Sequence, residues 1–91
     1  MGRSVEQIAQ TLALELAPAR VNVVAPGFVE TPLTARLLGE RLEQRRRQLA
    51  ESLPIGRTVN AADVAALTCH LMLNGAITGA VIPVDGGQVL A

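Results

Sequence analysis

The sequence predicts an α/β protein with a parallel sheet, in the order helix, strand, helix, helix, strand. Apolar residues recur at helical spacing over residues 4–17. The β-branched run over residues 20–25 is nearly continuous, which is typical of a parallel strand covered on both faces. Helical segments separate this run from a second strand over residues 81–84, and alternation of strands and helices indicates a parallel sheet.

The first predicted helix covers residues 4–17. Ser4 and Gln7 have the spacing of a capping box, and Pro18 ends the helix because its ring cannot continue the hydrogen-bond ladder. Leu14 and Ala17 add apolar character to the side opposite the main apolar face, which is formed by Val5, Ile8, Ala9, Leu12 and Leu16. A helix with two apolar sides is expected to have two neighbours, its own sheet and a second subunit.

The loop after the first strand has two interpretations. Pro26-Gly27 ends the strand, and Pro-Gly pairs commonly occur in the turns between helices and strands. Glycine also lets a backbone approach a ligand closely, and ligands of open α/β sheets bind beyond the carboxyl ends of parallel strands. Spacing alone therefore leaves open a plain corner or a ligand-holding loop.

Residues 33–50 are predicted to form a charged helix with an intermittent leucine stripe, which Gly39 weakens or breaks. The run Arg45–Arg47 is interpreted as a solvated face, because consecutive helical residues point in different directions and glutamates lie nearby. Residues 53–60 are predicted to be a linker.

The last predicted helix covers residues 61–73, with Asn60 as its N-cap and Asp63 in its first turn. Cys69 and His70 are interpreted as core or boundary residues. Two such side chains are too few for a metal site, which needs about three or four ligands, so no metal is predicted.

The chain is predicted to end on a strand and a turn. Pro83 lacks a backbone donor, so the strand over residues 81–84 is expected at a sheet edge. Asp85-Gly86-Gly87 is typical of a turn. Two parallel strands are too few to stand alone. The sheet is therefore expected to be completed by oligomerisation or by a missing N-terminal half.

Composition narrows the function classes. The 91 residues suffice for one small domain, and the net charge of zero argues against nucleic acid and anionic membranes as partners. The longest apolar stretch, "AALTCHLML", is too short to span a bilayer. One cysteine and an N-terminal stretch without an apolar signal region predict a cytoplasmic protein.

Two segments carry a family resemblance. "LALELAPARVNVVAPGFVETPL" resembles the last long core helix, the sixth strand and the following Pro-Gly loop of short-chain dehydrogenases/reductases. "LPIGRTVNAADVAALTCHLMLNGAITGAVIPVDGG" resembles the closing segment of that family. The resemblance implies that residues 1–91 form a single partial Rossmann-type domain. It further implies NAD or NADP as cofactor and a homo-oligomer assembled through the first helix, the final helix and the last strand.

The resemblance also implies site residues. Pro26, Gly27, Val29 and Thr31 would lie beside the nicotinamide, with the Val29 backbone bonded to its carboxamide and Thr31 bonded to the carboxamide or nearby phosphates. Residues 33–50 would be the substrate lid. This is the most variable part of the family, so the resemblance does not identify the substrate. The Asp85-Gly86-Gly87 turn would be structural and lead into subunit contacts.

The catalytic part of the family pattern has no match here. The chain contains no Tyr and no Lys, and no glycine-rich strand-turn-helix. Alignment on the family helix puts the catalytic Lys at about Gly2 and the Tyr before Met1. The sequence therefore predicts no catalytic residue, and an oxidoreductase fragment that is inactive alone. The alternatives are a non-catalytic oligomerisation module and an internal start within a full-length reductase.

Overall fold

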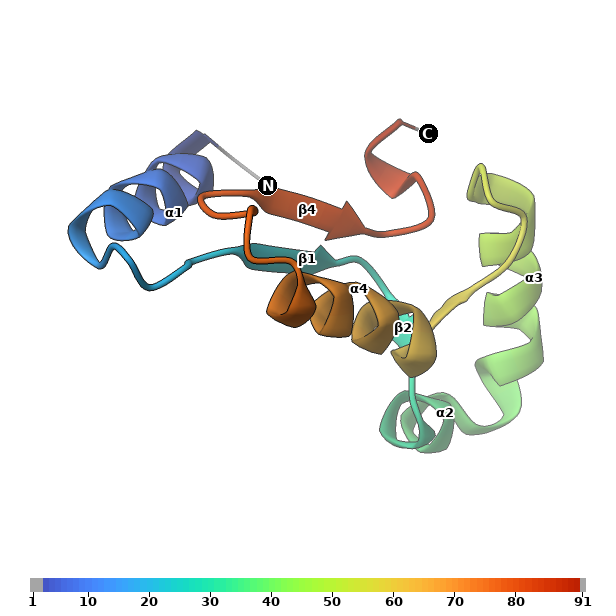
Figure 1. Cartoon of the computed structure of the whole chain (residues 1–91). Coiled ribbons are helices and arrows are strands. Elements are labelled where there is room, and N and C mark those ends of the chain that lie inside the picture. The colour runs from blue at the N-terminus through green and yellow to red at the C-terminus, as the bar shows by residue number, and fades with distance from the viewer. Residues whose placement is uncertain (1–2, 91) are drawn as a thin grey trace.

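A computed structural model describes residues 3–90 and shows the predicted α/β order (Figure 1). The elements are α1 (Arg3–Glu15), β1 (Val23–Pro26), β2 (Val29–Glu30), α2 (Pro32–Leu38), η1 (Gly39–Arg41), α3 (Leu42–Ser52), β3 (Val59–Asn60), α4 (Ala61–Leu73), β4 (Val81–Val84) and η2 (Gln88–Leu90).

Strands β1 and β4 form the predicted parallel pair, with Val23 opposite Val81 and Ala25 opposite Pro83. Helix α4 contacts β1 and helix α1 contacts β4. Within residues 3–90, this sheet has two strands only, so the edge position predicted for β4 from Pro83 stays a prediction. The α2–η1–α3 segment lies beyond the carboxyl ends of both strands (Figure 1).

A second parallel pair joins β2 to β3, with Val29 opposite Val59 and Glu30 opposite Asn60. The prediction of a linker over residues 53–60 was therefore wrong at its end. A two-residue strand is too short to show any periodicity in sequence. Its residue Val59 is buried, at 2% exposure. This pair places the loop after β1 against the start of α4.

Two local predictions need correction, and a third is confirmed. Ser4 lies inside α1, so its backbone is already helical and it cannot be the N-cap. Helix α1 ends at Glu15, before Pro18. The predicted helix over residues 33–50 is divided at Gly39, whose positive φ of 54° is the break that glycine suggested.

Cys69 and His70 are both exposed, so their interpretation as core or boundary residues was wrong. Val64, Leu67 and Leu71 take the inward side of α4 at spacings of three and four residues, which turns positions 69 and 70 outward.

Arg20 fixes the carboxyl end of α4. Its Nη1 donates to the Leu71 carbonyl at 2.6 Å and to the Asn74 carbonyl at 3.1 Å, and its Nη2 donates to the Met72 carbonyl at 3.0 Å. These carbonyls lie in the last turn and at the C-cap, where a helix has unsatisfied acceptors and a favourable site for a cation. Arg20 therefore joins the segment before β1 to the end of a helix about fifty residues later.

Asn22 fixes the turn between α4 and β4. Its Nδ2 donates to the Ile77 carbonyl and its Oδ1 accepts from the Ala80 backbone N–H, both at 3.0 Å. One amide thus satisfies both a donor and an acceptor of the neighbouring turn, which aligns β4 beside β1.

The start of α4 carries the predicted cap. Asn60 Oδ1 accepts from the Asp63 N–H at 3.2 Å, and Asp63 Oδ2 accepts from the Asn60 N–H at 2.9 Å. Arg57 adds two hydrogen bonds to the Asp63 carboxylate, at 2.8 and 2.9 Å. The hydrogen bonds from Arg57 and from the Asn60 backbone lower the pKa of Asp63 from 3.8 to about 2.

This ionised cap predicts an acid-sensitive helix start. Because the folded pKa is below the ordinary value, the stabilising contribution is present above pH 3.8 and is lost as pH falls towards about 2. Asp63→Asn is expected to unfold at lower temperature than wild type at pH 7 and at equal temperature at pH 2, followed by circular dichroism. Glu51→Gln, which alters an exposed carboxylate on α3, serves as the control. A temperature difference for Asp63→Asn that is the same at both pH values would contradict the assignment.

The core is small and the molecule is elongated. The buried apolar residues are Ala9, Ala13, Leu49, Leu53, Val59 and Leu71. The radius of gyration is 15.5 Å, against about 12 Å for a compact domain of this length. The accessible surface is 6277 Å², against about 5,000 Å² for a compact monomer of this mass. The elements thus leave apolar surface uncovered, including Leu14 at 81% and Leu73 at 87% exposure.

Among residues 3–90, no helix combines the length and the apolar character that crossing a membrane requires.

Candidate functional site

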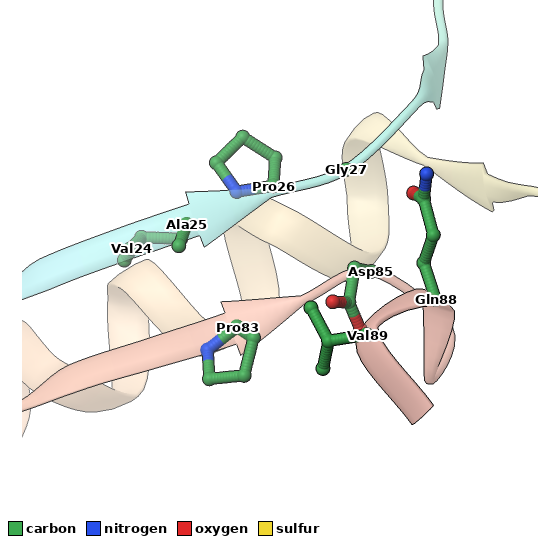
Figure 2. Close-up of a pocket in the computed structure, with 8 residues that line it drawn as sticks. All are labelled: Val24, Ala25, Pro26, Gly27, Pro83, Asp85, Gln88 and Val89. Carbon is green, nitrogen blue, oxygen red and sulfur yellow. The ribbon is translucent and has the colours of Figure 1, made fainter. Parts of the chain in front are cut away.

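The loop from Pro26 to Thr31 starts at the carboxyl end of β1, beside the carboxyl end of β4. A cavity of about 620 Å³ opens at this edge of the sheet (Figure 2), lined by Val24, Ala25, Pro26, Gly27, Pro83, Asp85, Gln88 and Val89. This is the position at which open α/β sheets bind ligands. The structure therefore puts the predicted loop at a ligand-accessible edge.

Gly27 packs against the turn that follows β4. A Cβ at this position would lie 2.5 Å from Gln88 Oε1 and 2.9 Å from Asp85 Cβ. Figure 2 shows the Gln88 side chain extending towards Gly27. The need for glycine thus arises within the chain itself, whichever ligand the loop holds.

The Asp85-Gly86-Gly87 segment forms the predicted turn. Asp85 is 9% exposed, and its Oδ1 accepts from the Gly87 N–H at 2.9 Å. Gly86 and Gly87 have φ of 68° and 88°, where L-residues are strained. A Cβ on Gly87 would lie 2.7 Å from Pro54 Cγ. Gly87 thus contacts Pro54, in the segment before β3, at a distance that only glycine allows. The sequence did not predict this contact.

Successive side chains of the loop contact different helices. Val29 lines a second cavity of about 380 Å³ against α4, together with Pro26, Ala61, Val64, Ala65, Thr68 and Cys69. Phe28 and Glu30 instead contact α3. The Arg45 guanidinium lies 5.2 Å from the Phe28 ring centroid, and Arg46 forms an ion pair with Glu30.

These contacts correct the interpretation of Arg45–Arg47 as a solvated face. Arg45 and Arg46 are half-buried and only Arg47 is exposed. The sequence could not show this, because Phe28 and Glu30 lie in a different element and meet α3 only through the tertiary fold.

Thr31 is the N-cap of α2. Its Oγ1 accepts from the Thr34 N–H at 3.1 Å, and the Thr34 hydroxyl accepts from the Thr31 N–H at 2.8 Å. Thr34 Oγ1 also donates to the Val29 carbonyl at 3.3 Å. Thr34 was missed in the sequence, although its spacing of three from Thr31 is that of a capping box.

The structure thus brings the four predicted site residues into one loop between two cavities. Pro26 lines both cavities, Gly27 the larger and Val29 the smaller, whereas Thr31 orders the start of α2. Backbone groups and small apolar side chains dominate this surface. Such a surface can hold and orient a ligand. In the described residues, no group of three or more His, Cys, Asp or Glu side chains could hold a metal ion.

Comparison with known proteins extends this picture. A family model described as enoyl-(acyl carrier protein) reductase matches residues 3–88. The short-chain dehydrogenase/reductase ucsE of an Acremonium species is 35% identical over 88 residues, which are 97% of this chain and 33% of that protein. The 3-oxoacyl-(acyl-carrier-protein) reductase MabA of Mycobacterium tuberculosis is 44% identical over 85 residues, 89% of this chain and 33% of MabA.

A solved structure agrees with these relatives. A small-chain dehydrogenase in complex with NADPH superposes with a TM-score of 0.84 at 32% identity, over 98% of this chain and 41% of that one. The chain spans about a third of the length of the curated relatives it matches. With a parallel α/β fold, matching segments from its first helix to its last turn and these similarities, the chain belongs to the short-chain dehydrogenase/reductase family of oxidoreductases.

Proposed function

We propose that this chain forms the nicotinamide-side wall of an NAD(P) site in a short-chain oxidoreductase. The observation that carries the proposal is the position of the Pro26–Thr31 loop, at the carboxyl edge of β1 and between two cavities. The NADPH complex of a structurally similar dehydrogenase supports the choice of ligand class. Hydride chemistry belongs to such a cofactor, so the protein has to hold and orient it.

Each site residue has a role in this proposal. The Val29 backbone binds the carboxamide, and its side chain borders the apolar cavity against α4. Thr31 supplies a hydroxyl to the carboxamide or the phosphates. Gly27 and Pro26 set the path of the loop, because the packing of Gly27 on Asp85 and Gln88 fixes where the loop leaves the sheet.

Proton transfer is assigned to residues outside this chain. The chain has no Tyr and no Lys. Its single histidine, His70, is exposed on α4 and lies 3.3 Å from Asn74 Nδ2 through its Nε2. Asp85 is occupied as the acceptor within its turn. A general acid has to reach the reacting atom. His70 is turned outward on α4, and Asp85 is already bonded within its own turn. The chain alone is therefore expected to be inactive, as a fragment of a larger reductase or as a stretch within one.

A second candidate function is that of a non-catalytic oligomerisation module in the cytoplasm. It is favoured by the exposed leucines of α1, of which Leu14 is 81% and Leu12 38% exposed. Contact of α1, α4 and β4 with further copies would cover this apolar surface. Light scattering tests it, and a stable monomer at micromolar concentration would count against the module.

A chimera tests the proposed cofactor wall. The matched 85 residues of MabA are replaced by those of this chain, and NADPH and NADH binding are measured by isothermal titration calorimetry. We expect the chimera to bind a nicotinamide cofactor. Thr31→Val should weaken that binding about tenfold by removing the hydroxyl. Thr31→Asn keeps a side chain that can cap α2, so this variant distinguishes the loss of helix capping from the loss of cofactor contact.

Two outcomes would contradict the proposal. One is a folded chimera that binds neither cofactor. The other is turnover of a carbonyl substrate by the 91-residue chain alone, because the proton would then have to come from this chain. Thr11→Val, at an exposed position on α1 that lines neither cavity, is the matched control for a threonine change that should leave binding unchanged.

A further inference from the structure

We propose that Arg46 is a positioning residue, a clamp that fixes α3 to the site loop through Glu30 and Glu43. Any effect of the clamp on a cofactor or substrate rests on the proposed function. The clamp itself is a contact within this chain and does not depend on a ligand.

Arg46 bridges two carboxylates with two different nitrogens. Its Nε pairs with Glu30 Oε1, and its Nη1 donates to Glu43 Oε1 at 2.5 Å. The guanidinium presents several donors in a planar fork, so it can hold both partners at once, which a point charge such as lysine does less well. Glu43 lies three residues before Arg46 on α3 and orients the guanidinium towards the loop.

Glu30 is the sheltered partner. Its side chain is 20% exposed, against 43% for Arg46 and 70% for Glu43. A carboxylate withdrawn from water in this way needs a charged or hydrogen-bonding partner. The interaction between Arg46 and Glu30 therefore differs from a solvated surface pair, and its loss would leave a half-covered charge.

A second contact acts on the same side of the loop. The Arg45 guanidinium lies over the Phe28 ring at 5.2 Å from its centroid, within the range of a cation–π interaction. Phe28 and Glu30 are two residues apart in the loop, and both side chains meet α3. Two neighbouring arginines of α3 thus reach two alternate residues of the loop.

The fold explains why α3 needs such a contact. Gly39, with φ of 54°, and η1 interrupt the helix, so α3 does not continue α2 as one rod. Leu49 and Leu53 bury the carboxyl end of α3, at 5% and 6% exposure. The clamp holds the opposite half of the helix.

The loop side of the clamp belongs to a strand pair. Glu30 lies in β2 and pairs in register with Asn60 of β3. Val29 and Thr31, the two residues proposed to touch the cofactor, are its direct neighbours in sequence. Movement of α3 is therefore expected to be coupled to these two residues, and the clamp sets how far the α2–α3 segment can swing from the site.

Hydrogen exchange of the full chain tests the clamp. Arg46→Gln is expected to speed amide exchange within Leu42–Gln48 by up to about fivefold, the upper end of the range for exposed ion pairs. Glu30→Gln should speed exchange less than Arg46→Gln, because it breaks only one of the two ion pairs of Arg46. The double variant should exchange no faster than Arg46→Gln alone, because Arg46→Gln already breaks the contact with Glu30. In about 1 M NaCl the difference from wild type should shrink, since charges are screened within a few ångströms.

Arg47→Gln is the matched control, with the same substitution one residue along α3 on an exposed arginine. Equal exchange in wild type and Arg46→Gln, equal effects of Arg46→Gln and Arg47→Gln, or fully additive effects of the two clamp variants would each overturn the proposal. The readout needs no cofactor. A chimera that fails to bind NADPH would contradict the proposed function, but it would not affect the hydrogen-exchange test of the clamp.

Discussion

Gly87→Ala is expected to destabilise the chain by about 2–5 kcal/mol, from two independent costs. Gly87 has φ of 88°, and an L-residue held in the left-handed region costs about 1–2 kcal/mol. The new methyl group would also lie 2.7 Å from Pro54 Cγ and 3.0 Å from Pro54 Cβ. Overpacking of this kind costs about 1–3 kcal/mol. Urea unfolding followed by circular dichroism at 222 nm measures the change.

Two other glycines separate these costs. Gly56 has φ of 75° but nothing within 4 Å of a built Cβ, so Gly56→Ala carries the conformational cost alone. Gly75 has neither a left-handed φ nor a neighbour within 4 Å. The expected order of destabilisation is Gly87→Ala, then Gly56→Ala, then Gly75→Ala. Equal effects of the first two would show that the contact between the last turn and Pro54 contributes nothing.

Arg20→Ala is the second large expected effect, at about 1–3 kcal/mol. It removes three hydrogen bonds from one guanidinium to the carbonyls of Leu71, Met72 and Asn74. Arg20→Lys should recover part of the loss, because it keeps the cation near the helix end but cannot reach several carbonyls in one plane. Urea unfolding and hydrogen exchange in the last turn of α4 provide the two measurements.

Arg36→Ala serves as the control for Arg20→Ala, because Arg36 is an exposed arginine on the short helix α2. Its loss should change stability by less than about 0.5 kcal/mol. If Arg20→Ala were as mild as Arg36→Ala, or if the exchange at the end of α4 were unchanged, Arg20 would not hold that helix end.

The local signals in the sequence predicted most of the elements. Helical periodicity located α1 and α4, and the β-branched runs located β1 and β4 as parallel strands. Asn60 and Asp63 formed the predicted cap because both partners lie within one turn of chain. Gly39 broke the charged helix for an equally local reason, its left-handed φ. Ser4 failed as a cap because helical backbone begins before it.

The contacts around the candidate site escaped sequence reasoning. Strands β2 and β3 have two residues each and exist only because residues 29–30 and 59–60 meet in space. Arg20 and Asn22 bond to partners more than fifty residues away. The orientation of Cys69 and His70 followed from which side of α4 the sheet covers.

By itself, the sequence determined the α/β class, the family and the loop that follows β1, because each is visible in residues that are neighbours along the chain. The parallel pairing followed from the alternation of strands and helices. Only the tertiary structure decided why Gly27 and Gly87 must be glycine and that Arg46 reaches Glu30. These features depend on distances between segments that the parallel crossover brings together, and spacing along a chain carries no information about such distances.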